Sequence, residues 1–124
     1  MAERPRLTEA ELRIMEAIWR LERATVAEVA DALPKPLGLA YNTVLTTMRI
    51  LEGKGYLRHS KAKQGRAFIY RPIVSRDAAT RNAVRHLLSR FFGNSPEALL
   101  LNLLENEQLS DAEMRRIRAA LEQK

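Results

Sequence analysis

Apolar positions in the first half of the chain recur at helical spacing, and helix-starting signals divide them into separate segments. Thr8 and Thr25 are each followed by a glutamate three residues later, which is the pattern of a capping box at a helix N-terminus. The periodicity behind them predicts helices over residues 8–22 and 25–33, and the prolines that follow end the second helix. The apolar stripe predicted for the first helix contains Leu12, Ile14, Met15, Ile18, Trp19 and Leu21.

A third helix, predicted over residues 40–54, has an apolar side and a small, polar side. Counted at about 100° per residue, three apolar residues share one side and a set of hydrogen-bonding residues lies opposite. The apolar side holds Val44, Met48 and Leu51, and the polar side holds Asn42, Thr43, Thr46 and Arg49. Gly55 ends this helix because glycine readily adopts a left-handed conformation.

Beyond Gly55 the spacing changes from helical to alternating, which indicates strands. Residues 56–63 and 66–73 are predicted as the two strands of a hairpin with a glycine at its tip. A helix, a short helix, a polar-faced helix and a hairpin, in this order, are typical of a winged helix-turn-helix.

The remainder of the chain is predicted to be helical. Ser75 and Ser95 can each cap a helix, and the proline after Ser95 suits the first helical position. Ser110 opens a third capping box. The expected fold class is mainly α with a small β-hairpin: a winged helix-turn-helix DNA-binding domain over residues 1–74, followed by a C-terminal helical dimerisation domain over residues 75–124.

Composition restricts the class of protein further. The 124-residue chain has 46% hydrophobic residues and no cysteine, which fits a small globular protein in a reducing compartment and excludes disulfides and thiolate chemistry. The sequence contains no signal-peptide pattern and no apolar stretch of the roughly 18 residues that span a bilayer. We therefore expect a cytoplasmic protein.

Positive charge is concentrated over residues 49–71. Seven basic side chains and one acidic side chain give this stretch a net charge of +6, equal to the formal net charge of the whole chain. Such a concentration favours binding to a polyanion. Because the stretch covers the end of the polar-faced helix and the hairpin, we expect double-stranded DNA as the partner, with the helix in the major groove.

The candidate DNA contacts follow from side-chain chemistry. Asn42 can pair with adenine through two hydrogen bonds, Arg49 can bind guanine or a phosphate, and threonines offer a hydroxyl and a methyl group. The hairpin tip would contact phosphates or enter the minor groove, which adds affinity without much sequence information. The predicted DNA-binding residues are Tyr41, Asn42, Thr43, Thr46, Arg49, Lys61, Lys63 and Arg66. Taken singly, each is also compatible with an ordinary solvated surface.

A leucine-rich run in the C-terminal half predicts an interface between two copies of the chain. A segment of about 50 residues is small for a self-sufficient core, so pairing with a second chain is favoured over a separate helical subdomain. A two-fold dimer also suits a near-palindromic operator with two half-sites. The predicted dimerisation residues are Leu99, Leu100, Leu103, Leu104, Met114, Ile117 and Leu121.

The sequence contains no recognisable catalytic or cofactor-binding constellation. His59 and His86 lack the spacing of metal ligands and are interpreted as ordinary strand and helix residues. We therefore expect no enzyme activity, no metal site and no cofactor. Two alternatives to an operator-binding repressor stay open: a winged-helix regulator controlled by a small ligand, and a protein-interaction module whose basic face binds an acidic partner.

Four stretches, in order, resemble the penicillinase-repressor (BlaI/MecI-type) family of winged-helix transcriptional regulators. They are residues 7–11 with 18–19, residues 40–44 with 51–57, residues 65–72, and residues 99–103 with 109–110 and 113. The resemblance covers nearly the whole chain. It implies a homodimer that binds an operator and represses antibiotic-resistance genes.

The resemblance also implies how repression ends. In the family, a membrane-bound sensor with a cytoplasmic zinc protease domain causes cleavage in the dimerisation helices after an asparagine, which corresponds here to Asn102. Leu103 follows it, where the best-known members have phenylalanine. Leu45 and Ile50 occupy helix positions that are basic in some members. Without cysteine, the chain lacks the C-terminal cluster of copper-responsive relatives.

Overall fold

Helices and a hairpin occur in the order that the sequence predicts, which confirms the fold class. The computed structural model describes residues 5–34, 39–62, 65 and 67–124. Its elements are α1 (Glu9–Leu21), α2 (Val26–Ala32), α3 (Tyr41–Gly53), β1 (Leu57–Lys61), β2 (Phe68–Pro72), α4 (Arg76–Phe91), α5 (Pro96–Asn106) and α6 (Asp111–Glu122). Among the described residues, no helix is long and apolar enough to cross a membrane.

The chain divides into two units, residues 1–83 and 84–124. The first contains α1 to α3, the hairpin and the start of α4, and the second contains the rest of α4 with α5 and α6. The functional division predicted between residues 74 and 75 stays a prediction.

All three predicted capping boxes are present. Thr8 Oγ1 accepts from the Glu11 N–H at 3.2 Å, and Glu11 Oε1 accepts from the Thr8 N–H at 2.8 Å. The same reciprocal pair starts α2 at Thr25 and α6 at Ser110. Local sequence therefore determines where these helices begin, because each box satisfies backbone donors that have no partner inside the helix.

The end of α3 follows from Gly55. This residue has a φ of 87°, in the left-handed region that glycine tolerates. Its N–H donates to the Glu52 carbonyl at 3.1 Å, and the Tyr56 N–H donates to the Leu51 carbonyl at 2.9 Å. These are the two hydrogen bonds of a Schellman motif, and they turn the chain from α3 directly into β1.

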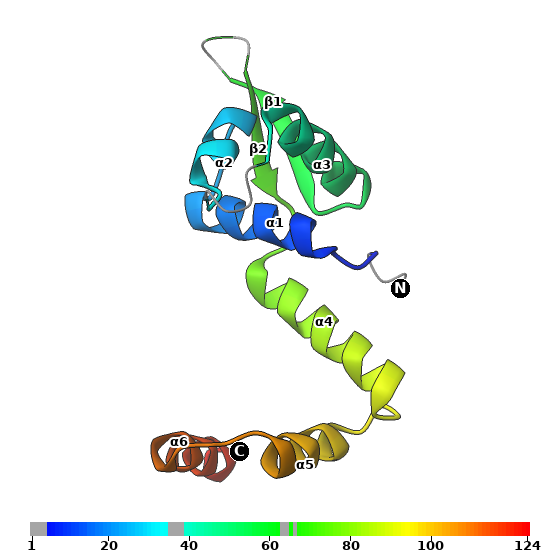
Figure 1. Ribbon diagram of the computed structural model, residues 1–124, viewed down its shortest axis with the longest axis vertical. Coiled ribbons are helices and arrows are strands. Elements are labelled where there is room, and N and C mark those ends of the chain that lie inside the picture. The colour runs from blue at the N-terminus through cyan, green and yellow to red at the C-terminus, as the bar shows by residue number, and fades with distance from the viewer. Residues whose placement is uncertain (1–4, 35–38, 63–64, 66) are drawn as a thin grey trace. The chain divides into compact units, whose positions relative to one another are not determined.

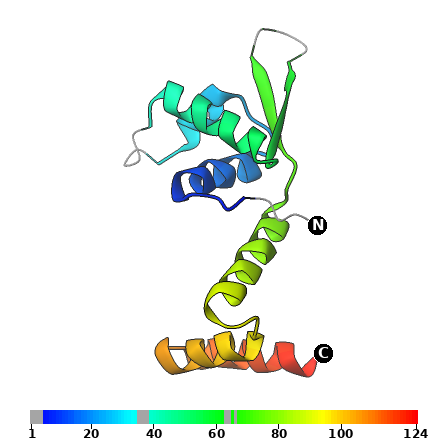
Figure 2. The ribbon, with the colours of Figure 1, turned by 90° about the vertical axis from the view of Figure 1, so that its right-hand side faces the viewer.

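The hairpin pairs antiparallel, with Leu57 opposite Pro72 and Lys61 opposite Phe68. Tyr70 also forms two hydrogen bonds outside the hairpin: its N–H donates to the Ala24 carbonyl at 2.8 Å, and the Ala24 N–H donates to its carbonyl at 3.0 Å. The segment between α1 and α2 is thereby fixed to the sheet, a pairing that the sequence did not predict. Figures 1 and 2 show the hairpin alongside the three helices of this unit.

The core lies between α1, α2, α3 and the hairpin, and its buried apolar residues all fall between positions 14 and 74. The stripe predicted for α1 is correct for Ile14, Met15 and Ile18, which have no exposed surface, but wrong for Leu12 and Leu21, which are 39% and 38% exposed. Leu12 lies about 120° around the helix from the centre of the buried face, and Leu21 is the last residue of the helix.

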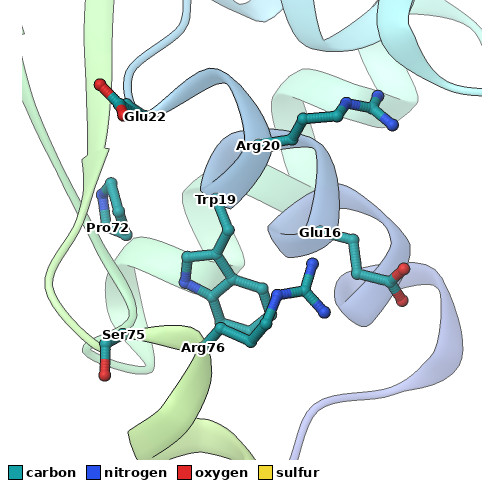
Figure 3. Close-up of a pocket in the computed structure, with 7 residues that line it drawn as sticks. All are labelled: Glu16, Trp19, Arg20, Glu22, Pro72, Ser75 and Arg76. Carbon is teal, nitrogen blue, oxygen red and sulfur yellow. The ribbon is translucent and has the colours of Figure 1, made fainter.

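Trp19, predicted as a core residue, packs against the edge of the core and stays partly exposed. Its Nε1 donates to the Val74 carbonyl at 2.9 Å, and the Arg76 guanidinium lies 5.2 Å from its ring centroid. These contacts hold the start of α4 to α1. Beside them is an open cavity of about 620 Å³ (Figure 3), lined by Glu16, Trp19, Arg20, Glu22, Pro72, Ser75 and Arg76.

A buried carboxylate fastens α1 to the end of α3. Glu11 is only 5% exposed, and its Oε1 accepts from Lys54 Nζ at 2.7 Å, while Nζ also donates to the Arg6 carbonyl at 3.1 Å. Burial raises the pKa of Glu11, but the Lys54 ammonium and the Thr8 N–H together outweigh burial, so the pKa lies below its ordinary value of 4.5. A depressed pKa stabilises the fold above the ordinary pKa, and that contribution is lost as the pH falls through the folded-state pKa.

We expect Glu11→Gln to lower the free energy of unfolding at pH 7 by about 1–3 kcal/mol. Glutamine keeps the capping-box acceptor but carries no charge for Lys54. Urea denaturation at pH 7 and at pH 3 measures the effect. The difference from the wild type should shrink at pH 3, because the contribution of a depressed pKa declines below the ordinary value of 4.5.

Glu9→Gln is the matched control in the same helical turn. Glu9 is 84% exposed and its carboxylate lies 3.6 Å from Arg13, so its loss should change stability by at most about 0.5 kcal/mol. If Glu11→Gln lowers the free energy of unfolding by the same amount at both pH values, the charge of Glu11 contributes nothing to stability.

Candidate nucleic-acid interface

α3 presents one side to the core and the other to solvent. Val44, Met48 and Leu51 have no exposed surface, which is the apolar side expected from the sequence. The residues predicted to contact DNA from this helix are all exposed: Tyr41, Asn42, Thr43, Thr46 and Arg49. The outer side of the helix therefore carries these hydrogen-bonding side chains, whose DNA contacts stay predictions.

The hairpin lies next to α3, with β1 packed against it. Arg58 and Lys61 are exposed on β1, so the hairpin supplies positive charge beside the outer side of α3. Lys63 and Arg66, the other two predicted contacts, lie outside the described residues.

The basic stretch is not uniformly free to bind an anion. Lys54 is held by Glu11 and the Arg6 carbonyl, and Arg71 Nη1 donates to Ser60 Oγ at 3.0 Å across the hairpin. Counting charges in the sequence therefore overstates the positive surface, because the count does not distinguish a cation that supports the fold from one that faces solvent.

A pair of side chains connects α3 to the hairpin, and no pattern in the sequence predicts it. His59 Nδ1 on β1 lies 2.8 Å and 2.7 Å from the two carboxylate oxygens of Glu52 on α3. The His59 ring also packs against Phe68 and Tyr70, with ring centroids 4.6 Å and 5.4 Å apart. The sequence predicts only an ordinary strand residue at position 59, because the contact with Glu52 depends on the turn at Gly55.

Glu52 places a negative charge between α3 and the hairpin, within a stretch that is otherwise basic. Burial raises the pKa of the Tyr70 hydroxyl, and the Glu52 carboxylate raises it further against the opposing charge of Arg49. Side chains of Glu52 and His59 remain 32% and 36% exposed. The imidazole Nδ1 is therefore the described partner of a carboxylate that stays partly open to solvent.

A sequence model of the family described as penicillinase repressor matches residues 7–123. The chain belongs to the penicillinase repressor family. It is 32% identical to a penicillinase repressor of Bacillus licheniformis over 119 residues, which are 96% of this chain and 91% of that protein. It is 31% identical to the transcriptional regulator BlaI of Mycobacterium tuberculosis, over 98% of this chain and 89% of that protein.

Solved structures of a family member show the same DNA-binding fold. The DNA-binding domain of the repressor BlaI, and the monomeric form of Bacillus licheniformis BlaI in complex with the blaP half-operator, each match with a TM-score of 0.52 and 32% identity. Each match covers 63% of this chain and 93% of the solved chain. Membership of the penicillinase repressor family makes this chain a winged-helix, DNA-binding transcriptional repressor.

We expect His59→Ala to weaken DNA binding about fivefold, for specific and unrelated duplexes alike. If DNA phosphates approach this side of α3, the substitution leaves the Glu52 carboxylate without its hydrogen-bond partner there, and the resulting repulsion does not depend on base sequence. Titration of labelled duplexes at two salt concentrations measures it, and the loss should be smaller at high salt because salt screens exposed charges.

The double variant Glu52→Gln/His59→Ala separates charge from shape. Removing the carboxylate should restore most of the affinity, although the imidazole is still missing. If the double variant binds as poorly as His59→Ala alone, the pair acts through packing of the hairpin and the electrostatic interpretation is wrong.

Proposed function

We propose that this chain is a dimeric repressor that binds a near-palindromic operator and controls antibiotic-resistance genes in the bacterial cytoplasm. The observation that carries the proposal is the exposed polar side of α3 next to the basic hairpin. A helix of this kind fits the major groove, where base edges present distinct donor and acceptor patterns. The half-operator bound by monomeric BlaI of Bacillus licheniformis supports one half-site for each subunit.

In this proposal, α3 selects the sequence and the hairpin supplies affinity. Asn42 pairs with adenine, Thr43 and Thr46 contact base edges, and Arg49 binds guanine or a phosphate. Phosphate contacts come from Tyr41 at the start of α3 and from the hairpin, and they orient the protein without distinguishing bases. Among the described hairpin residues, Lys61 is proposed to contact a phosphate. Lys63 and Arg66 are proposed to contact phosphates as well.

Asn42→Ala should reduce affinity for the operator by about 1–3 kcal/mol while leaving affinity for unrelated DNA nearly unchanged. Lys61→Ala should weaken both by similar factors and make the salt dependence shallower, because one phosphate contact per subunit is lost. If each subunit neutralises about four phosphates, the wild-type dimer should give a log–log salt slope of about −7.

Fluorescence anisotropy with operator and scrambled duplexes measures these quantities. If Asn42→Ala leaves the ratio of operator affinity to scrambled-DNA affinity unchanged, the proposed orientation of α3 in the groove is wrong. A salt slope near zero for the wild type would contradict DNA binding through the basic surface. It would favour an acidic protein partner instead.

The second unit supports the dimer. None of residues 84–124, all of which the structure describes, is buried. Large apolar side chains of α5 and α6 remain exposed: Leu100, Leu101, Leu103, Leu104 and Leu121 are 39%, 47%, 41%, 41% and 60% exposed. Exposed leucines gathered in two short helices are typical of an interface. We propose that a second copy covers it, together with the half-buried Leu99, Met114 and Ile117.

Leu103→Glu should convert the dimer into a monomer, because it places a charge in the proposed interface without touching the core of the first unit. The matched control is Leu12→Glu: Leu12 is 39% exposed, close to the 41% of Leu103, but lies on α1. Sedimentation equilibrium should show the first variant as a monomer and the second as a dimer. If both stay dimeric, the interface lies elsewhere.

We also propose that repression ends by cleavage between Asn102 and Leu103, caused by a membrane sensor-protease. The bond lies in the middle of α5, and the Asn102 carbonyl accepts from Asn106 Nδ2 at 3.0 Å. Cleavage would create two charged termini within the apolar interface, and an unpaired buried ion costs several kcal/mol. Because helical backbone resists proteases, the substrate is a locally opened state.

The chain truncated after Asn102 tests this step in the same centrifuge experiment and should be monomeric. If the truncated chain still dimerises, cleavage cannot release the repressor from the operator by separating the two subunits. Control by a small ligand would then be favoured, with the cavity beside Trp19 as the place to look for it.

A further inference from the structure

One large apolar residue interrupts the polar outer side of α3. Ile50 is 45% exposed, whereas the core-facing residues of the same helix have no exposed surface. At about 100° per residue, Ile50 lies about 40° from Thr46 and 20° from Thr43. It therefore belongs to the stripe of residues proposed to face the groove.

Ile50 is turned away from the hairpin. Glu52, which contacts His59 on β1, lies about 160° from Ile50 around the helix axis. The side of α3 toward the hairpin is thus occupied by Glu52. Core packing and hairpin packing both leave the Ile50 side chain available on the outer surface.

An exposed isoleucine elsewhere on the protein would need no explanation. On this surface the case is different, because binding of α3 in the major groove would remove Ile50 from water against base edges. Isoleucine offers no hydrogen bond to a base, so polar base edges opposite it would lose their water without gaining a partner. The C5-methyl group of thymine is the one apolar group that the major groove displays.

We propose that Ile50 is a specificity-determining residue that binds the C5-methyl group of a thymine in each half-site. The inference rests on the proposed function, in which α3 enters the major groove. Two consequences follow from the chemistry: thymine is favoured at the facing base pair because two apolar groups leave water together, and bases with only polar edges are disfavoured. Thr43 and Thr46, in the same stripe, favour methyl contacts at neighbouring positions.

Deoxyuridine substitution tests the contact, since it removes only the methyl group. A high-affinity site is first selected from random duplexes with the wild-type chain, and each thymine of one half-site is then replaced by deoxyuridine in turn. At one position the wild type should lose about fourfold in affinity. Ile50→Ala should bind the unmodified site more weakly and lose nothing further at that position.

Ile73→Ala is the matched control. Ile73 is 49% exposed and lies just after β2, outside α3, so this variant should keep the full fourfold loss. Thermal unfolding monitored by circular dichroism checks that Ile50→Ala is folded, as expected for a surface position on a helix.

The outcomes separate this inference from the proposed function. Methyl sensitivity that persists unchanged in Ile50→Ala at every position would assign the methyl contact to another residue and overturn the inference. A wild type that selects a defined site yet shows no methyl-sensitive thymine would also overturn it, while operator binding would stand. Failure to select any site would instead overturn sequence-specific binding through α3.

Discussion

The burial of Val44, Met48 and Leu51 determines the orientation of α3, and the candidate interface depends on it. Rotating this helix about its axis would expose three apolar side chains, each worth about 1.5–3 kcal/mol when buried. The core therefore selects which residues face outward, independently of the chemistry of those residues. Outward positions such as Asn42 and Ile50 can change without disturbing the fold, so the proposed sequence recognition lies on the side of the helix opposite to the one that stabilises it.

Features determined by local sequence could be predicted with good accuracy. The capping boxes and the left-handed glycine after α3 act over a few residues, and each is found at its expected place. Contacts between distant residues could not be predicted. Ala24 pairs with Tyr70, and Glu52 contacts His59, only once the elements have packed. The spacing of residues in the sequence does not predict such tertiary contacts.

Burial separates the two units physically. The first unit encloses its apolar side chains between helices and hairpin, whereas residues 84–124, all described, contain leucines and no buried residue. Hydrophobic surface removed from water is the main favourable contribution to folding, so the second unit gains little of it from its own chain. In the proposed dimer, the second copy would cover these leucines and supply the burial that a single chain lacks.

Lys54 shows how a charged residue in a DNA-binding region can mislead genetic analysis. It stands between Arg49 and Arg58 in the sequence, yet its ammonium group is bound to Glu11 and to the Arg6 carbonyl. A screen for loss of repression would recover substitutions here together with those of true contact residues. Their cause would be a lower amount of folded repressor in the cell, so raising expression would rescue them, as it would not rescue a lost base contact.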